Sequence, residues 1–154
     1  KKMRKYFRPF EIFSIKGDYN QKIKQFLENP SALIIYGVYR TNSLKKSIIV
    51  KKILAFDFII ILNVLEFGNI NVLNETLFKY YNKGMSSNGL INQFKKGQIP
   101  LSDVIFPYYN FFNYSFKKFG LSFIISNFQR FFTFYTGGIV SNIKEIFMTI
   151  KLNK

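Results

Sequence analysis

Hydrophobic periodicity in the last third of the chain predicts the order strand, helix, strand. A short β-branched and aromatic run at Ser102–Phe106 and a second run at Leu121–Ile125 are typical of buried strands. Between them lies a helical stripe of phenylalanines spaced by four and three residues: Phe112, Phe116 and Phe119. Gly120 suits the end of that helix. This order predicts two parallel strands joined by a right-handed crossover.

The residues that follow predict a polar, aromatic loop and then a final helix. The loop ends in a glycine pair, Gly137 and Gly138, which predicts either a plain turn or backbone N–H groups directed at a phosphate. From Ser141 onward, the apolar residues fall on one helical stripe: Ile143, Ile146, Phe147 and Ile150. We expect this stripe to pack on the sheet.

The N-terminal half shows the same alternation of apolar runs and helical stripes. Residues 18–28 predict a short helix, because an Asp and a Gln at its start form a capping-box pattern. Residues 32–36 and 56–62 predict two buried strands. The segment between them, 43–54, is predicted to be helical, although its apolar residues spread around the helix and leave a strand open. Residues 73–84 carry another helical stripe.

Alternating helices and continuously apolar strands predict a parallel sheet that is covered on both faces. We therefore predict an α/β fold, a three-layer sandwich of the flavodoxin-like or Rossmann-like type. Its mostly parallel sheet would have four or five strands. The length of 154 residues fits one domain at residues 18–154, preceded by a basic N-terminal arm at residues 1–17.

Five short segments also stand in a characteristic order: Tyr81–Asn82, Asn88–Phe94, Asp103–Phe106, Phe119–Ile125 and Ile143–Ile146. Their sequences and order resemble the C-terminal half of small-subunit ribosomal protein two, the universal S-two family of bacterial and organellar ribosomes. The resemblance extends over residues 32–152, most weakly at its N-terminal end. It implies an α/β fold, contacts with ribosomal RNA and neighbouring small-subunit proteins, and no enzymatic activity.

The chain also departs from that family. Met85–Ser86 stand where the family has Arg-Trp, and Gly137–Ser141 replace its Pro-Gly-Asn-Asp-Asp loop. The family's long helical hairpin has no counterpart, because the sequence holds no sustained heptad pattern. Contacts that the family's loop acids make are therefore not implied for this chain.

The charge predicts a polyanionic partner. Lys and Arg number 23 against 8 Asp and Glu, a net charge of +15, which favours nucleic acid or an anionic membrane surface. Residues of AT-rich codons are abundant, which indicates an AT-rich genome and explains part of the lysine excess. Together with the resemblance, this predicts a structural constituent of the mitochondrial small ribosomal subunit that binds ribosomal RNA and neighbouring ribosomal proteins.

Two alternatives stay open: a nucleotide-binding α/β enzyme and a basic peripheral membrane protein. Against the enzyme, Asn63–Gly68 has one glycine and no Lys-Ser/Thr, unlike a phosphate-binding loop. We expect no membrane span, because the longest apolar run, Ile53–Phe67, contains polar residues and is shorter than the roughly 20 residues that a bilayer requires.

The residue types restrict the chemistry further. The chain has no Cys and no His, which removes the common nucleophile–base pairs and the thiolate and imidazole metal ligands. A pair of catalytic carboxylates, Asp57 and Asp103, is conceivable, but acids that cap strands or pair with lysines are the simpler interpretation. We expect no catalytic residue, no metal site, no small-molecule substrate and no cofactor, apart from Mg²⁺ ions that bridge RNA phosphates.

The candidate RNA-binding residues are cations, several of them interleaved with aromatic residues. Such cations neutralise phosphates while the rings stack on unpaired bases; for the N-terminal arm, a solvated tail is the alternative. Arg130 predicts either RNA contact or local packing, and Tyr108 and Tyr109 are open to core packing or stacking. The full set is Lys1, Lys2, Arg4, Lys5, Arg8, Arg40, Lys45, Lys46, Lys95, Lys96 and Arg130, with Gly89, Gly137 and Gly138 as loop or turn residues.

Overall fold

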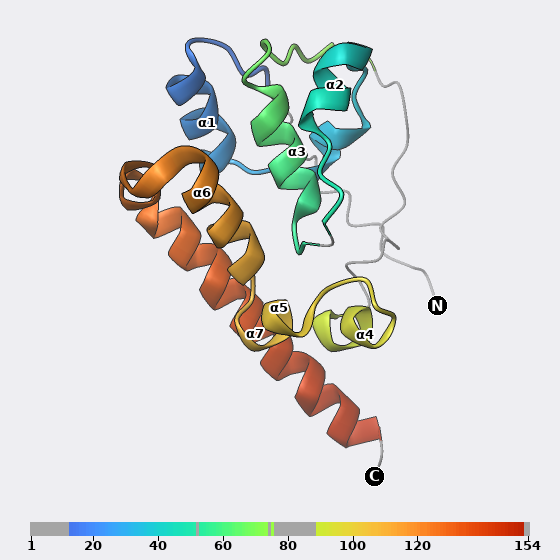
Figure 1. Cartoon of the computed structure of the whole chain (residues 1–154). Coiled ribbons are helices and arrows are strands. Elements are labelled where there is room, and N and C mark those ends of the chain that lie inside the picture. The colour runs from blue at the N-terminus through green and yellow to red at the C-terminus, as the bar shows by residue number, and fades with distance from the viewer. Residues whose placement is uncertain (1–12, 52, 74, 76–88, 153–154) are drawn as a thin grey trace.

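The computed structural model describes residues 13–51, 53–73, 75 and 89–152, the last four by their backbone alone. In this part of the chain the secondary structure is helical (Figure 1). The elements are α1 (Tyr19–Glu28), the 3₁₀ helix η1 (Ala32–Tyr36), α2 (Thr41–Ser47), α3 (Phe56–Val64), α4 (Leu90–Lys95), α5 (Leu101–Ile105), α6 (Tyr109–Ser126) and α7 (Phe128–Leu152). The β-pairing among these residues is one isolated antiparallel bridge between Ile15 and Ile70.

The predicted three-layer α/β sandwich is therefore wrong, since the described residues form no parallel sheet. The segments predicted as buried strands lie instead in η1, α3, α5 and the second half of α6. The physical reason is that a short, continuously apolar run signals burial but carries no period. Such a run does not distinguish a buried strand from a buried helix.

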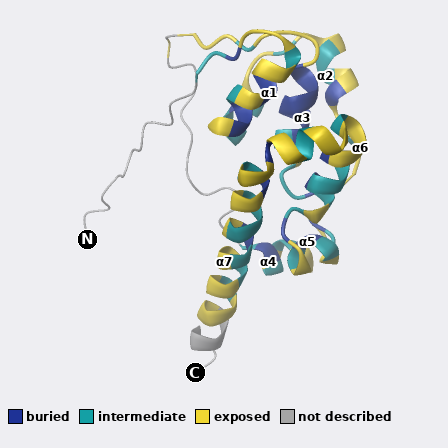
Figure 2. Cartoon of the chain, turned by 90° about the vertical axis from the view of Figure 1, so that its left-hand side faces the viewer, coloured by how far each residue is buried: buried dark blue, intermediate teal, exposed yellow. Residues whose placement is uncertain are grey.

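Helix α3 is the clearest example, because all six of its residues after the first turn are buried. Every residue from Ile59 to Leu65 is buried, and Figure 2 shows α3 as largely dark blue among its neighbours. Helices α2, α6 and η1 pack against it, and Phe26 of α1 meets its Phe58 ring edge-on at 5.6 Å. A helix that is hydrophobic all round is stable only in such a position.

The one polar residue in this buried run, Asn63, joins three helices. Its side-chain Nδ2 donates to the Ser47 carbonyl at the end of α2 at 3.0 Å and to the Tyr114 hydroxyl of α6 at 2.9 Å. Its Oδ1 accepts from Lys118 Nζ of α6 at 2.8 Å. Because a buried amide is costly without partners, these bonds explain how a polar residue fits the centre of the core.

The predicted helix at residues 18–28 is confirmed, and its N-terminus has the predicted capping box. The Asp18 carboxylate accepts from the Gln21 N–H at 3.0 Å, and Gln21 Oε1 accepts from the Asp18 N–H at 3.1 Å. Its apolar stripe is buried at Ile23, Phe26 and Leu27. The helix was predictable because both its period and its start signal are present in the sequence.

Helices α6 and α7 pack side by side through their aromatic residues (Figure 1). The Phe131 ring of α7 lies 5.7 Å from Phe111 and 5.2 Å from Phe112 of α6, between ring centroids. Gly120 interrupts α6 with φ at 80° and ψ at 176°, but the chain beyond it is again helical rather than a strand.

The predicted packing of the last helical stripe onto a sheet is also wrong. In α7, Ile143, Ile146 and Phe147 are 47%, 48% and 68% exposed, and no sheet is present among the described residues to receive them. The helix meets the body of the protein through other positions, including Phe131, Phe134 and Gly138. The sequence predicted the helix and its apolar stripe, but Ile143, Ile146 and Phe147 face away from the core, and the side chain of Ile150 lies outside the described residues.

The predicted turn at Gly137 and Gly138 lies instead within α7, where the two glycines have different surroundings. A Cβ added to Gly138 would come closer to Pro107 Cβ than real Cβ atoms approach, whereas nothing lies within 4 Å of one added to Gly137. The physical reason for the second glycine is thus the close approach of α7 to the junction between α5 and α6.

We expect Gly138→Ala to lower the free energy of unfolding by about 1–3 kcal/mol, the usual cost of overpacking. Gly137→Ala is the matched control, and it should raise that free energy by up to about 1 kcal/mol because alanine favours the helix. Urea unfolding of both variants measures the difference. A stabilising effect of both alanines would contradict the packing of α7 on Pro107.

Candidate nucleic-acid interface

The carboxylates of the described residues largely serve the protein itself. Asp18 caps α1, Glu66 pairs with Lys118 at 3.1 Å, and Glu28 pairs with Arg130 at 3.0 Å. Glu145 of α7 accepts from the backbone N–H groups of Ile91 and Asn92 at 3.0 and 3.1 Å, at the start of α4. These acids are thus committed to helix caps and to ion pairs with Lys118 and Arg130, and none of them pairs with the described lysines of α2 or α4.

The two acids considered for catalysis also have structural roles. Asp103 is fully buried, and its carboxylate accepts from the Leu54 N–H at 3.1 Å and the Asn110 N–H at 3.0 Å. Asp57 accepts from the Phe58 N–H at 2.9 Å, and burial raises the pKa of its carboxyl. Burial, and then the charge of Asp57, raises the pKa of the Tyr108 hydroxyl. Within the described residues, no three His, Cys, Asp or Glu side chains are arranged to hold a metal ion.

Exposed lysines gather at the ends of two short helices. Lys45 and Lys46 lie in the last turn of α2, Lys95 lies in the last turn of α4, and Lys96 follows it. Their charges are favourable there because the C-terminus of a helix carries partial negative charge. Lys46 also lies 5.7 Å from the centroid of the Phe67 ring. The structure adds Lys51, exposed in the segment that follows α2.

An apolar groove lies beside the first half of α6, and we call it the aromatic groove. It consists of two adjoining shallow depressions, wide open to solvent, of about 260 and 230 Å³, which share Tyr109 and Phe112. The remaining lining residues are Phe106, Pro107 and Tyr135 in the first, and Asn113, Phe116 and Ile124 in the second. Phe106, Tyr109 and Phe116 are 55%, 49% and 49% exposed, so their rings are accessible from solvent.

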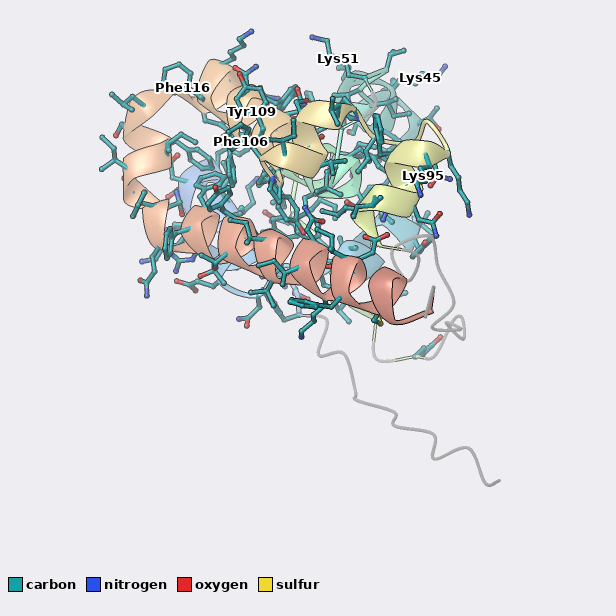
Figure 3. All side chains as sticks on the ribbon, turned by 90° about the horizontal axis from the view of Figure 1, so that it is seen from below. Lys45, Lys51, Lys95, Phe106, Tyr109 and Phe116 are labelled. Atoms are coloured by element: carbon teal, nitrogen blue, oxygen red, sulfur yellow. The ribbon has the colours of Figure 1, made fainter. Side chains whose placement is uncertain are left out.

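The lysines and the aromatic groove lie on one side of the molecule. In Figure 3, Lys45, Lys51 and Lys95 occupy the same upper side of the view as Phe106, Tyr109 and Phe116, with α7 opposite. Figure 2 agrees for α2, α5 and α6, which it places on the side away from α7, whereas α4, which carries Lys95, lies next to α7. We call this side the basic aromatic face.

The structure separates the other sequence candidates. Arg130 forms an ion pair with Glu28, which favours the local-packing interpretation. Arg40 precedes α2 and is exposed, and Gly89 precedes α4 with φ at 74°. The candidates Lys1, Lys2, Arg4, Lys5 and Arg8 lie outside the described residues.

The groove was not predictable from the sequence, because its residues fall in segments whose patterns indicate other elements. Phe106 was predicted inside a strand and Phe116 on the core-facing stripe of a helix. The sequence allows core packing or stacking for both Tyr108 and Tyr109, and the structure distinguishes them: Tyr108 packs among Phe111, Phe112 and Phe134, whereas Tyr109 is exposed. The signal that was present is Pro107, which marks the break between α5 and α6.

Comparison with known proteins gives no match: no family model, curated protein or solved structure is similar to this chain at a significant level.

Proposed function

We propose that this chain is a structural RNA-binding protein without enzymatic activity, and that its partner is the ribosomal RNA of a mitochondrial small ribosomal subunit, together with neighbouring ribosomal proteins. The observation that carries the proposal is the basic aromatic face. The lysines of this face are exposed. The ion pairs within the described residues join Lys118 to Glu66 and Arg130 to Glu28, so they do not neutralise these lysines.

The electrostatic argument joins the sequence to the structure. A net charge of +15 is a property of the whole chain, but it attracts a polyanion only where the cations are exposed and the acids are engaged elsewhere. The lysines of α2 and α4 meet the first condition, and the caps and ion pairs of the acids meet the second. A nucleic-acid backbone, which carries closely spaced phosphates, is the matching partner.

The ribosomal part of the proposal rests on the order of the sequence segments. The described residues form helices where the S-two family has a parallel sheet, so the fold lends it no support. The composition, typical of an AT-rich genome, favours an organelle as the location. The alternative of a nucleotide-binding α/β enzyme depended on a doubly wound parallel sheet. Because the described residues form no such sheet, we do not propose that alternative.

The full chain should bind structured RNA with an affinity that falls steeply as salt rises. The expected slope of log affinity against log salt is about −0.7 to −0.9 for each phosphate neutralised. Substituting Lys45→Ala and Lys95→Ala together should make that slope shallower by roughly one per lysine. Fluorescence anisotropy with a labelled hairpin measures both quantities.

The matched control is Lys24→Ala with Lys144→Ala, which removes two exposed lysines from α1 and α7. It should change the slope less than the first pair does. A flat salt dependence in the unmodified chain would contradict RNA binding altogether, and equal effects of the two pairs would contradict the location of the interface.

A second candidate, binding to the surface of an anionic membrane, is favoured by the exposed apolar stripe of α7. Phe128, Phe132, Ile143, Ile146 and Phe147 are all exposed along this helix, and a basic chain with such a stripe suits an interfacial position. No helix in the described part of the chain is long and apolar enough to cross a bilayer. Flotation with anionic vesicles, compared with RNA pull-down, separates the two candidates.

A further inference from the structure

We infer that the aromatic groove binds unpaired bases of RNA, so that the basic aromatic face recognises single-stranded loops or bulges rather than continuous duplex. This inference rests on the proposed function, which it deepens by naming the class of RNA. The lysines would contact the phosphates, and the rings of Phe106, Tyr109 and Phe116 would stack on the bases.

The local backbone explains why these rings face solvent. Pro107 is buried and follows Phe106, the C-cap of α5, and Tyr108 then adopts a left-handed conformation with φ at 66°. This turn sends the Tyr108 ring inward, 5.7 Å from the Phe134 ring, while Tyr109 begins α6 with its ring half exposed. A left-handed conformation is strained for a residue other than glycine, so the core contacts of Tyr108 hold the outward position of Tyr109.

The chemistry of the groove fits the face of a base. Its lining is almost wholly apolar and aromatic, with Asn113 and the two tyrosine hydroxyls as the polar groups. Stacking on such rings tolerates every base, because each base presents a π face. A continuous duplex keeps its bases stacked on one another and offers only base edges and phosphates to a protein. Duplex RNA would therefore use the lysines and leave the groove empty.

Charge complementarity selects RNA over an apolar peptide or a second copy of the chain. Lys117 follows Phe116 directly and is exposed, and Lys45, Lys51 and Lys95 lie on the same side of the molecule. A second copy would bring equal positive charge to this side and be repelled. A strand with unpaired bases supplies both the negative charge that the lysines attract and the flat base faces that stack on the rings.

The experiment compares two labelled RNAs with the same number of phosphates, a hairpin with an unpaired loop and a blunt duplex, each with the full chain. The unmodified chain should bind the hairpin about tenfold more tightly. The variant with Phe106→Leu and Phe116→Leu keeps apolar side chains but loses the rings, and it should lose that preference while its duplex affinity stays unchanged. The variant with Phe106→Tyr and Phe116→Tyr keeps the rings and should retain the preference.

Phe147→Leu on α7, also an exposed phenylalanine, is the matched control and should bind both RNAs normally. Equal affinity of the unmodified chain for the two RNAs overturns the inference but leaves RNA binding intact, whereas absence of binding to either RNA overturns the proposed function itself. If the unmodified chain self-associates, and the leucine variant loses this self-association while its RNA affinities stay unchanged, the groove binds a second copy of the chain. This result would overturn the inference.

Discussion

Phe111→Ala should lower the free energy of unfolding by about 3–5 kcal/mol, the cost of removing a fully buried aromatic side chain. Phe111 is 0% exposed. Its ring centroid lies 6.5 Å from that of Phe58 in α3 and 5.7 Å from that of Phe131 in α7. The residue thus joins the central helix to the α6–α7 pair, and the cavity left by alanine would open at the meeting point of three helices.

Phe116→Ala is the matched control, because Phe116 lies on the same helix but is 49% exposed. Phe116→Ala should lower the free energy of unfolding by much less than Phe111→Ala does. Urea unfolding followed by far-ultraviolet circular dichroism measures both variants. A larger loss of stability for Phe116→Ala than for Phe111→Ala would contradict the burial of Phe111, and would indicate that another face of α6 packs against the core.

Asp103→Asn should lower the free energy of unfolding by about 1–3 kcal/mol, the cost of leaving one buried N–H without an acceptor. The two carboxylate oxygens of Asp103 serve the N–H groups of Leu54 and Asn110. An amide has only one oxygen, so its NH₂ group would face the second donor. Because this carboxylate holds the segment before α3 against the start of α6, the loss should also reduce cooperativity between these helices.

The control for this change is Asp18→Asn, in an exposed N-cap position where asparagine serves as well as aspartate. It should leave stability nearly unchanged. RNA affinity, measured on the folded variants, separates a structural role from a chemical one. Intact stability of the Asp103→Asn variant with loss of function would contradict the structural role assigned to this carboxylate.

What the sequence predicted well were the elements that carry their own start signal and period. The helix from Tyr19 to Glu28 has both a capping box and an amphipathic stripe, and its prediction is confirmed. Helical character around Phe112 and Phe119 is also confirmed. In these cases, the local pattern and the final packing agree.

The failed predictions share one physical cause. Residues 56–62 and 121–125 are apolar without a period, and only their tertiary neighbours decide between strand and helix. Helix α3 is apolar on every side because other helices surround it. The α7 stripe shows the opposite problem, since a correct helical period does not reveal whether the apolar face meets the core or a partner.

The basic aromatic face could be predicted only in part. Lysine doublets such as Lys45–Lys46 and Lys95–Lys96 are visible in the sequence, but their common side depends on how α2 and α4 are placed. The exposure of Phe106 and Tyr109 depends on the backbone turn at Tyr108, which no local pattern announces. The cationic and aromatic character of this face was thus predictable, whereas its geometry was not.

The most direct test of the central claim is co-sedimentation of the full chain with small ribosomal subunits through a sucrose gradient at low and high salt. The chain should migrate with the small subunit at low salt and move to the top of the gradient as salt rises, because salt weakens the proposed contacts between lysines and phosphates. A chain that stays at the top of the gradient at low salt, or that floats with membranes instead, would contradict the account.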